Sequence, residues 1–303
     1  VAAIFEEEAD ALACIGKEKE ADRFSELCNM ISGRFPSLKG WLASRPLTAL
    51  EYDRQWPRLL SVLTWLEHYP QPGIYVRQLE VPDVDTKFIE QHKKLLAELL
   101  DIILPHNAID ETARGISGFE QRYGFLSKPS QIRFRLLDRD LYIQGLSDLQ
   151  VPADDFSMLN LPVDKVFITE NDINGLAFPS LEKSLVIFGL GYGLDRLARA
   201  DWLADKKLYY WGDIDTHGFA MLDQMRHFFP HTVSFLMDRQ TLMAHQSSWV
   251  EEKTQMNREL TRLNPVEHSL YDDLKNDRLA GGVRLEQERI SFRHVKKCLE
   301  NFK

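Results

Sequence analysis

The feature that most constrains the fold is a series of short apolar runs in the second half of the chain. Their length and composition are those of buried strands, at Lys165–Thr169, Leu185–Leu190 and Lys207–Trp211. One helical segment (194–203) separates the last two runs, and another (219–229) follows the third. Strands that alternate with helices favour an α/β domain with a mostly parallel sheet. We assign this domain to residues 163–303.

The first half of the chain predicts helices followed by a small mixed module. Apolar residues at helical spacing predict a helical arm over residues 1–72, which ends at a Pro- and Gly-rich cluster. The next elements are expected at 74–79 (strand), 86–104 (helix, capped by Asp85), 119–125 (short helix), 132–137 and 141–143 (strands). Helices followed by a two-stranded wing indicate a winged-helix module over residues 73–151. The whole chain is therefore expected to be multidomain and α+β overall.

Composition limits the range of functions. The chain has 37 Lys and Arg against 46 Asp and Glu, a formal net charge of −9. Such a chain is not expected to coat DNA passively, although it is compatible with an acidic metal site and a local basic surface. The apolar runs are too short to span a membrane. Cys14, Cys28 and Cys298 match no metal-binding spacing. We therefore expect a cytoplasmic protein in a reducing compartment.

Three acidic residues follow two of the apolar runs. Asp213 and Asp215 lie two apart, so they would converge at the carboxyl end of a parallel strand, where α/β sheets place their sites. Glu170 would face them if the two strands are neighbours. Carboxylates at one edge repel unless a cation joins them, and oxygen ligands suit Mg²⁺ or Mn²⁺. Alternatively, Asp215 or Thr216 caps the next helix, Asp213 is merely exposed and Glu170 is a solvent-exposed strand end. The Asp-x-Asp motif alone favours neither interpretation.

Other residues give weaker indications. Glu286 and Glu288 could add a carboxylate or lie on a charged surface. The segment 114–144 leans basic, so it is the first place to expect nucleic acid, unless it is a solvated surface with salt bridges. The candidate DNA-contacting residues are Arg122, Lys128, Arg133, Arg135 and His217. His217 could touch a phosphate or a metal, or be a structural donor. Tyr123 is the best-placed candidate nucleophile, although packing of a helix end is the simpler role.

The stretch from Val166 to Arg226 resembles the Toprim domain, which primases, type IIA and type VI topoisomerases and Spo-eleven-like proteins share. In that family one glutamate follows the first strand, and an Asp-x-Asp follows a later one. The matching positions here are Glu170, Asp213 and Asp215. The resemblance implies a Rossmann-like parallel sheet with a metal site at these three residues.

Longer strings resemble the JetD family (also called MksG), the nuclease subunits of Wadjet anti-plasmid systems. These strings are at 84–90, 133–138, 169–179 and 211–218, and the likeness runs from about Trp41 to the C-terminus. It implies a winged-helix, CAP-like module and a Toprim nuclease that works as a homodimer and cuts both strands of closed-circular plasmid DNA. It also implies an SMC-type ATPase, a kleisin and a KITE subunit as partners. The string 286–290 is typical as well, which makes Glu288 a candidate fourth metal ligand.

Three functional hypotheses follow. The favoured one is an Mg²⁺- or Mn²⁺-dependent DNA endonuclease, in which Glu170, Asp213 and Asp215 hold the metal or, in the case of Glu170, transfer a proton. The second is a tyrosine transesterase like topoisomerase VI, which would use Tyr123; the resembled family lacks that tyrosine. The third is a non-catalytic DNA-binding adaptor that keeps the fold for dimerisation. A relict site has no reason to keep all three acids, which disfavours the third hypothesis.

Overall fold

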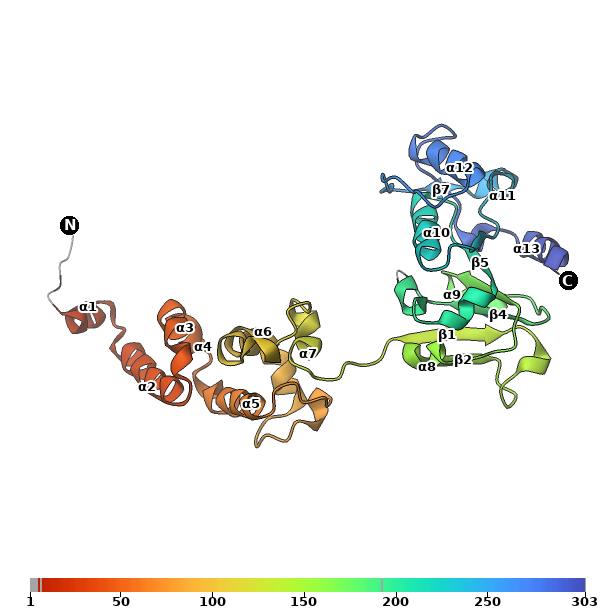
Figure 1. Ribbon diagram of the computed structural model, residues 1–303. Coiled ribbons are helices and arrows are strands. Elements are labelled where there is room, and N and C mark those ends of the chain that lie inside the picture. Colours follow the sequence, from red (N-terminus) through yellow and green to blue (C-terminus); the bar gives the residue numbers. More distant parts are fainter. Residues whose placement is uncertain (1–4, 6, 192, 303) are drawn as a thin grey trace. The chain divides into compact units, whose positions relative to one another are not determined.

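The computed structural model describes residues 5, 7–191 and 193–302 (Figure 1). These residues form two compact units, one that extends to Lys128 and one that begins at Pro129. Each unit has a hydrophobic core of its own. Among the described residues, no helix is both long enough and apolar enough for a membrane crossing.

The N-terminal unit is built from helices. They are α1 (Glu8–Ile15), α2 (Glu18–Arg34), α3 (Lys39–Ser44), α4 (Pro46–Glu51), α5 (Trp56–His68), α6 (Thr86–Ile103) and α7 (Phe119–Arg122). The helix predicted at 86–104 is confirmed as α6, and the carboxylate of Asp85 caps it by accepting the N–H of Phe88 at 2.7 Å. The buried stripe of α6 includes Phe88, Leu96 and Leu100, which explains why its helical period was readable in the sequence.

The strand predicted at 74–79 is wrong. Val76–Gln78 form a 3₁₀ turn, and only an isolated bridge between Tyr75 and Leu126 remains of the expected pairing. The side chain of Gln78 accepts the N–H of Tyr75 at 2.9 Å and closes the turn. A side chain that captures a backbone donor in this way competes with strand pairing.

The C-terminal unit contains a six-stranded sheet in the order β2-β1-β4-β3-β5-β6. Its strands are β1 (Gln131–Leu136), β2 (Asp148–Pro152), β3 (Lys165–Thr169), β4 (Ser184–Phe188), β5 (Lys207–Trp211) and β6 (Val233–Ser234). Strands β4, β3, β5 and β6 run parallel, whereas β1 is antiparallel to both β4 and β2. The predicted α/β domain with a mostly parallel sheet is therefore confirmed.

The predicted wing does not form. The strand predicted at 132–137 is observed as β1, but β1 pairs with β4 and belongs to the C-terminal sheet. The second strand expected at 141–143 is wrong, because Arg139–Leu141 form a 3₁₀ turn and the hairpin partner of β1 is β2. The buried residues of β1 are Ile132, Phe134 and Leu136, which join the core of the C-terminal unit. Period-two alternation thus indicated the strand correctly but not its sheet.

The observed division of the chain differs from the expected boundaries. Residues 73–151, expected as one module, are shared between the two units, which divide at 128 and 129. The segment 152–162, which lies between the two expected domains, carries α8 (Ala153–Ser157). The ring of Phe156 in α8 is fully buried against Phe134 of β1, so this segment is part of the core.

Further helices and a two-stranded antiparallel sheet complete the C-terminal unit. They are α9 (Asp172–Ala177), α10 (Thr216–Phe228), α11 (Arg239–Ala244), α12 (Pro265–Lys275), α13 (Phe292–Leu299), β7 (Val250–Glu251) and β8 (Val283–Arg284). The helix expected at 194–203 is instead two 3₁₀ turns. The antiparallel β7–β8 pair is followed by the bridge between Leu285 and Ile214, which brings the chain back to the end of β5.

Candidate active site

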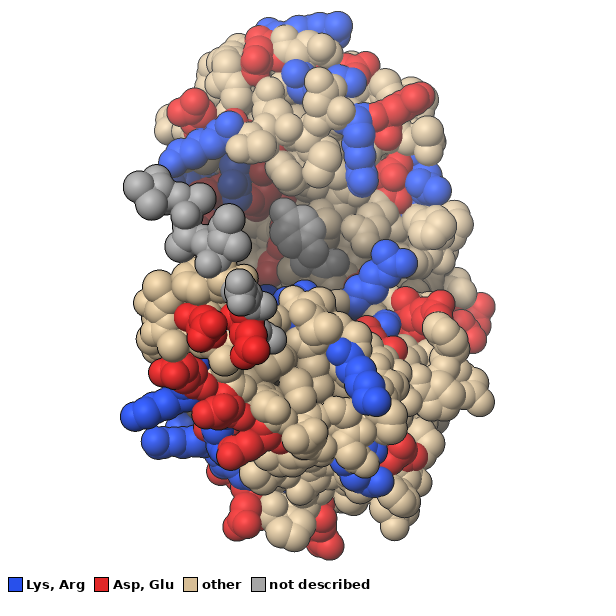
Figure 2. All heavy atoms as spheres, turned by 90° about the vertical axis from the view of Figure 1, so that its left-hand side faces the viewer, with Lys and Arg blue, Asp and Glu red and all other residues tan. Residues whose placement is uncertain are grey.

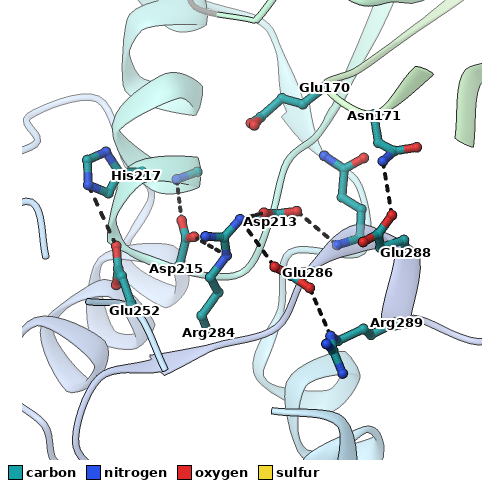
Figure 3. A network of polar contacts seen from close by, with 12 residues as sticks. Glu170, Asn171, Asp213, Asp215, His217, Glu252, Arg284, Glu286, Glu288 and Arg289 are labelled. Atoms are coloured by element: carbon teal, nitrogen blue, oxygen red, sulfur yellow. Dashed lines mark hydrogen bonds and ion pairs between the residues drawn. The ribbon is translucent and has the colours of Figure 1, made fainter. Parts of the chain in front are cut away.

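Glu170 and the Asp-x-Asp turn leave the sheet at the same edge. Strands β3 and β5 are parallel neighbours, and Thr169 pairs with Trp211 at their carboxyl ends. Glu170 and Gly212 are the next residues of the two strands, so the turn that carries Asp213 and Asp215 begins beside Glu170. In Figure 3, Glu170 lies above the turn that carries Asp213 and Asp215. All three residues line one cavity. The expected neighbourhood of the two strands is therefore observed.

A third segment lies on this turn through a small antiparallel bridge. Ile214 and Leu285 exchange both backbone hydrogen bonds, at 2.9 and 3.1 Å, and both side chains are fully buried. In an antiparallel pair, the residues that flank the bridge face each other on the opposite side of the ribbon. The bridge therefore places Arg284 opposite Asp215 and Glu286 opposite Asp213, with all four side chains on the cavity side.

Arg284 is the cation of this cluster. Its Nη2 lies 2.6 Å from Oδ2 of Asp213 and 3.7 Å from Oε1 of Glu286, and its Nε lies 3.2 Å from Oδ2 of Asp215 (Figure 3). Arg284 was not among the site residues predicted from the sequence. Residues 283–287 do alternate between buried and half-buried positions, so a strand-like reading of Val-Arg-Leu-Glu would have placed Arg284 and Glu286 on one face.

The carboxylate of Glu170 lies in a narrow space beside the end of β5. The Tyr210 hydroxyl donates a hydrogen bond to Oε1 of Glu170. A Cβ atom at Gly212 would lie 2.9 Å from that same oxygen, so only glycine leaves room for the carboxylate there. Burial, reinforced by the charges of Asp213 and Asp215, raises the pKa of Glu170 to about 7. A cation that entered the cavity would favour the ionised form.

Asp215 caps the next helix and also lies in the acidic cluster. It caps α10 by accepting the N–H of Gly218 at 2.7 Å, and it faces Arg284 in the acidic cluster. Burial raises the pKa of Asp215 to about 6, and the nearby carboxylates of Glu252 and Asp213 add to the effect. The cap and the acidic site are therefore not exclusive alternatives.

Glu252 is a buried acid that sequence reasoning missed. Its carboxylate accepts the hydroxyl of Thr216 at 2.5 Å and the N–H of Thr216 at 3.2 Å, so it holds the first turn of α10. His217 lines the same cavity, with Nε2 2.9 Å from the carbonyl oxygen of Thr254 and 3.9 Å from Glu252. The backbone contact is the one expected of a structural donor, while the ring stays partly exposed to the cavity.

Gln287 ties the three segments of the site together. Its backbone N–H donates to Oδ1 of Asp213 at 2.8 Å, and its buried side-chain amide donates to the carbonyl of Trp211 at 2.8 Å. The amide oxygen accepts from Thr169 at 2.5 Å and from Asn174 at 3.2 Å. The ends of β3 and β5 and the start of α9 are thus joined through one residue.

We expect Gln287→Leu to lower the free energy of unfolding by about 2–3 kcal/mol, because it leaves several buried polar partners unsatisfied. Urea denaturation followed by circular dichroism measures the change. Gln246→Leu, at an exposed position in a 3₁₀ turn, is the matched control. A loss of stability no larger than that of the control would show that the hydrogen bonds of Gln287 contribute little.

The donor chemistry of the cavity fits a hard divalent cation. A cavity of about 500 Å³ and a neighbouring one of about 200 Å³ share Glu170, Asp213, Arg284 and Glu286 as lining residues. Carboxylate oxygens are the ligands that Mg²⁺ and Mn²⁺ prefer. Among the described residues, however, no three His, Cys, Asp or Glu side chains are already gathered as a metal-ligand set. The positive charge between Asp213 and Asp215 is instead the guanidinium of Arg284.

Glu288, predicted as a fourth ligand, lies at the rim. It is exposed, lines only the smaller cavity, and accepts a hydrogen bond from Nδ2 of Asn171 at 3.3 Å. Glu286 is closer to the aspartates, because it stands opposite Asp213 and within 3.7 Å of Arg284. The structure thus brings Glu286, rather than Glu288, to the centre of the cluster.

Most of the predicted DNA-contacting residues have partners within the protein. Arg122 forms a two-pronged ion pair with Asp101 at 2.9 and 3.0 Å, and Arg133 does the same with Asp148 at 3.0 and 2.6 Å. Arg135 donates to the carbonyl of Phe178, while Lys128 is exposed. On the face shown in Figure 2, basic and acidic side chains are interspersed. That distribution is the one expected of a solvated surface with salt bridges.

Tyr123 is a core residue of the N-terminal unit. Only 1% of it is exposed, and its hydroxyl lies 2.6 Å from Oδ1 of Asp101 and 3.0 Å from the carbonyl oxygen of Ala97. Burial raises the pKa of the phenol well above its usual value. This environment is that of a packed structural tyrosine and opposes formation of a nucleophilic phenolate.

Comparison with known families decides the group to which the chain belongs. The family described as Wadjet protein JetD, C-terminal, matches residues 124–299, more than half of the chain. This chain belongs to the JetD family. A second family, described as an uncharacterized protein conserved in bacteria, N-term, matches residues 1–101. No curated protein matches the chain significantly. Membership of the JetD family makes the protein a component of a Wadjet system that acts with other Wadjet subunits.

Proposed function

We propose that this JetD-family protein is a divalent-metal-dependent DNA endonuclease that cleaves closed-circular plasmid DNA. The observation that carries the proposal is the convergence of Glu170, Asp213 and Asp215 at the carboxyl ends of two adjacent parallel strands. α/β sheets place their sites at this edge, and the carboxylate oxygens that line this cavity are the ligands that Mg²⁺ and Mn²⁺ prefer. The arrangement also supports assignment of this sheet as a Toprim-type domain.

The proposed mechanism assigns a role to each acid. Mg²⁺ or Mn²⁺, when bound, would neutralise phosphodiester charge and activate water. Asp213 and Asp215 would hold the cation, and the turn between them is fixed by the Ile214–Leu285 bridge and by the cap on α10. Glu170, with its pKa raised to about 7, is suited to accept a proton from the attacking water. Tyr210 keeps the Glu170 carboxylate oriented toward the cavity.

The proposed setting is that of a Wadjet nuclease subunit. We propose that the protein binds double-stranded plasmid DNA as a homodimer and works with an SMC-type ATPase, a kleisin and a KITE subunit. Membership of the JetD family supports this assignment. The tyrosine transesterase alternative receives no support from Tyr123, whose hydroxyl is buried and bonded within the N-terminal unit.

Incubation of supercoiled plasmid with the purified protein tests the proposal. We expect linear product with Mn²⁺ or Mg²⁺, strengthened by the partner subunits, and none with EDTA. Product denatured in detergent should carry no attached protein. A covalent adduct at a tyrosine would instead support the transesterase. Binding of DNA without cleavage under any of these conditions, partners included, would support the adaptor.

A further inference from the structure

Arg284 stands where a metal ion would be expected to neutralise the acidic cluster. Its guanidinium touches Asp213, Asp215 and Glu286, and it borders both adjoining cavities. About a third of its side chain, 36%, is exposed, so the group lies at the mouth of the site rather than beneath it. Its backbone belongs to β8, which the pairing with β7 and the Ile214–Leu285 bridge hold in place.

The contacts of Arg284 are incomplete. Its Nε is buried and makes no hydrogen bond among the described residues, although Oδ2 of Asp215 lies 3.2 Å away. A buried donor without an aligned acceptor is unfavourable. The pairing with Asp213 is well made, whereas the pairing with Asp215 is electrostatic only. Because one of its contacts lacks a hydrogen bond, the guanidinium should move away at a smaller energetic cost than that of a fully hydrogen-bonded arginine.

Charge also opposes the coexistence of Arg284 and a metal at this point. A divalent cation that bound Asp213 and Asp215 would lie within a few ångströms of the guanidinium, and like charges at that separation repel strongly in a partly buried site. The long side chain of Arg284 can turn toward the open part of the cavity, while its backbone stays fixed. A phosphodiester that enters the cavity would offer the guanidinium a bidentate anionic partner.

We propose that Arg284 exchanges partners when the site is loaded: it neutralises Asp213 and Asp215 in the metal-free protein, yields them to the divalent cation, and then binds a phosphate of the DNA. Arg284 is thus both a competitor that sets the metal affinity of the site and a phosphate-binding residue. The inference rests on the proposed nuclease function and adds a residue to it.

Direct measurement of Mn²⁺ binding tests whether Arg284 competes with the metal, and it does not depend on DNA cleavage. We compare the wild-type chain with Arg284→Gln by electron paramagnetic resonance of free Mn²⁺, and expect the variant to bind Mn²⁺ at least about tenfold more tightly. Arg289→Gln is the matched control, because it removes the same charge from a residue whose only ion pair, within the described part of the chain, is with Glu286. We expect a change of about twofold or less in this control.

The affinity for a labelled DNA duplex in Ca²⁺ tests whether Arg284 binds a phosphate. We expect Arg284→Gln to bind the duplex about tenfold more weakly, even though its metal site is tighter. Circular dichroism checks folding. If the glutamine variant does not fold, Arg284→Lys decides, because lysine cannot contact both aspartates and should give an intermediate gain in Mn²⁺ affinity.

Unchanged or weaker Mn²⁺ binding in Arg284→Gln, or an equal gain in Arg289→Gln, would overturn the competition. Unchanged DNA affinity would overturn the phosphate contact. Failure of the wild-type protein to bind Mn²⁺ at all would refute the proposed metal site itself, a result distinct from both of these.

Discussion

Replacing Glu170 with glutamine is expected to slow plasmid cleavage by about a thousandfold or more, which would make it the most damaging conservative change at the site. Glutamine keeps the size of the side chain and can still accept the hydrogen bond from Tyr210. It cannot accept a proton, and it removes one of the three negative charges that attract the cation. Linearisation of supercoiled plasmid in Mn²⁺, followed over time on agarose gels, measures the rate.

Glu259→Gln provides the matched control for this experiment. Glu259 is an exposed glutamate of the same unit and does not line either cavity of the acidic site. Its replacement should leave the rate within about twofold, since exposed charges away from a site contribute little. Cleavage by Glu170→Gln at the wild-type rate would remove Glu170 from the catalytic machinery.

The same substitution should stabilise the metal-free protein at alkaline pH. The folded-state pKa of Glu170, about 7, lies above the ordinary value of 4.5, so the folded state holds this proton more tightly than the unfolded state. The stability linked to it is complete below about pH 4.5 and is lost as the pH rises through 7. A neutral glutamine avoids that loss. In EDTA at pH 8, Glu170→Gln should therefore be more stable than wild type by roughly 3 kcal/mol.

Urea denaturation of both proteins at pH 4.5 and pH 8 measures this difference. The gap between variant and wild type should shrink toward zero at pH 4.5, where Glu170 is protonated in the folded state and about half protonated in the unfolded state. Addition of Mn²⁺ at pH 8 should reverse the order, because the cation should stabilise the protein that keeps all three carboxylates more than the variant that keeps only the two aspartates. A variant that is less stable than wild type at pH 8 in EDTA would show that the buried carboxylate is already compensated.

Local patterns in the sequence predicted those strands and helices whose own residues show which faces are buried. The apolar runs that became β3, β4 and β5 were recognisable because both faces of a parallel strand are buried, and the stripe of α6 carried its own period. Once β3 and β5 were taken as neighbours, the meeting of Glu170 with Asp213 and Asp215 followed.

Features that depend on distant partners could not be predicted in this way. The alternation of β1 indicated a strand, but its pairing with β4 across some 50 residues decided that it joined the C-terminal sheet rather than a wing. Arg284 is 71 residues away from Asp213, and only the Ile214–Leu285 bridge makes them neighbours. Glu252, too, reaches the site through a long connection and the hydrogen bonds of Thr216.

The Ile214–Leu285 bridge also has a consequence for protein synthesis. A ribosome releases the chain from its N-terminus, so the segment with Glu170, Asp213 and Asp215 emerges well before Leu285 does. Until the last part of the chain docks, the turn lacks its backbone partner, its arginine and the clamp of Gln287. A nascent chain that has not yet reached Leu285 would therefore carry the acids in a turn without these contacts, and the proposed nuclease activity would depend on the later docking of that segment.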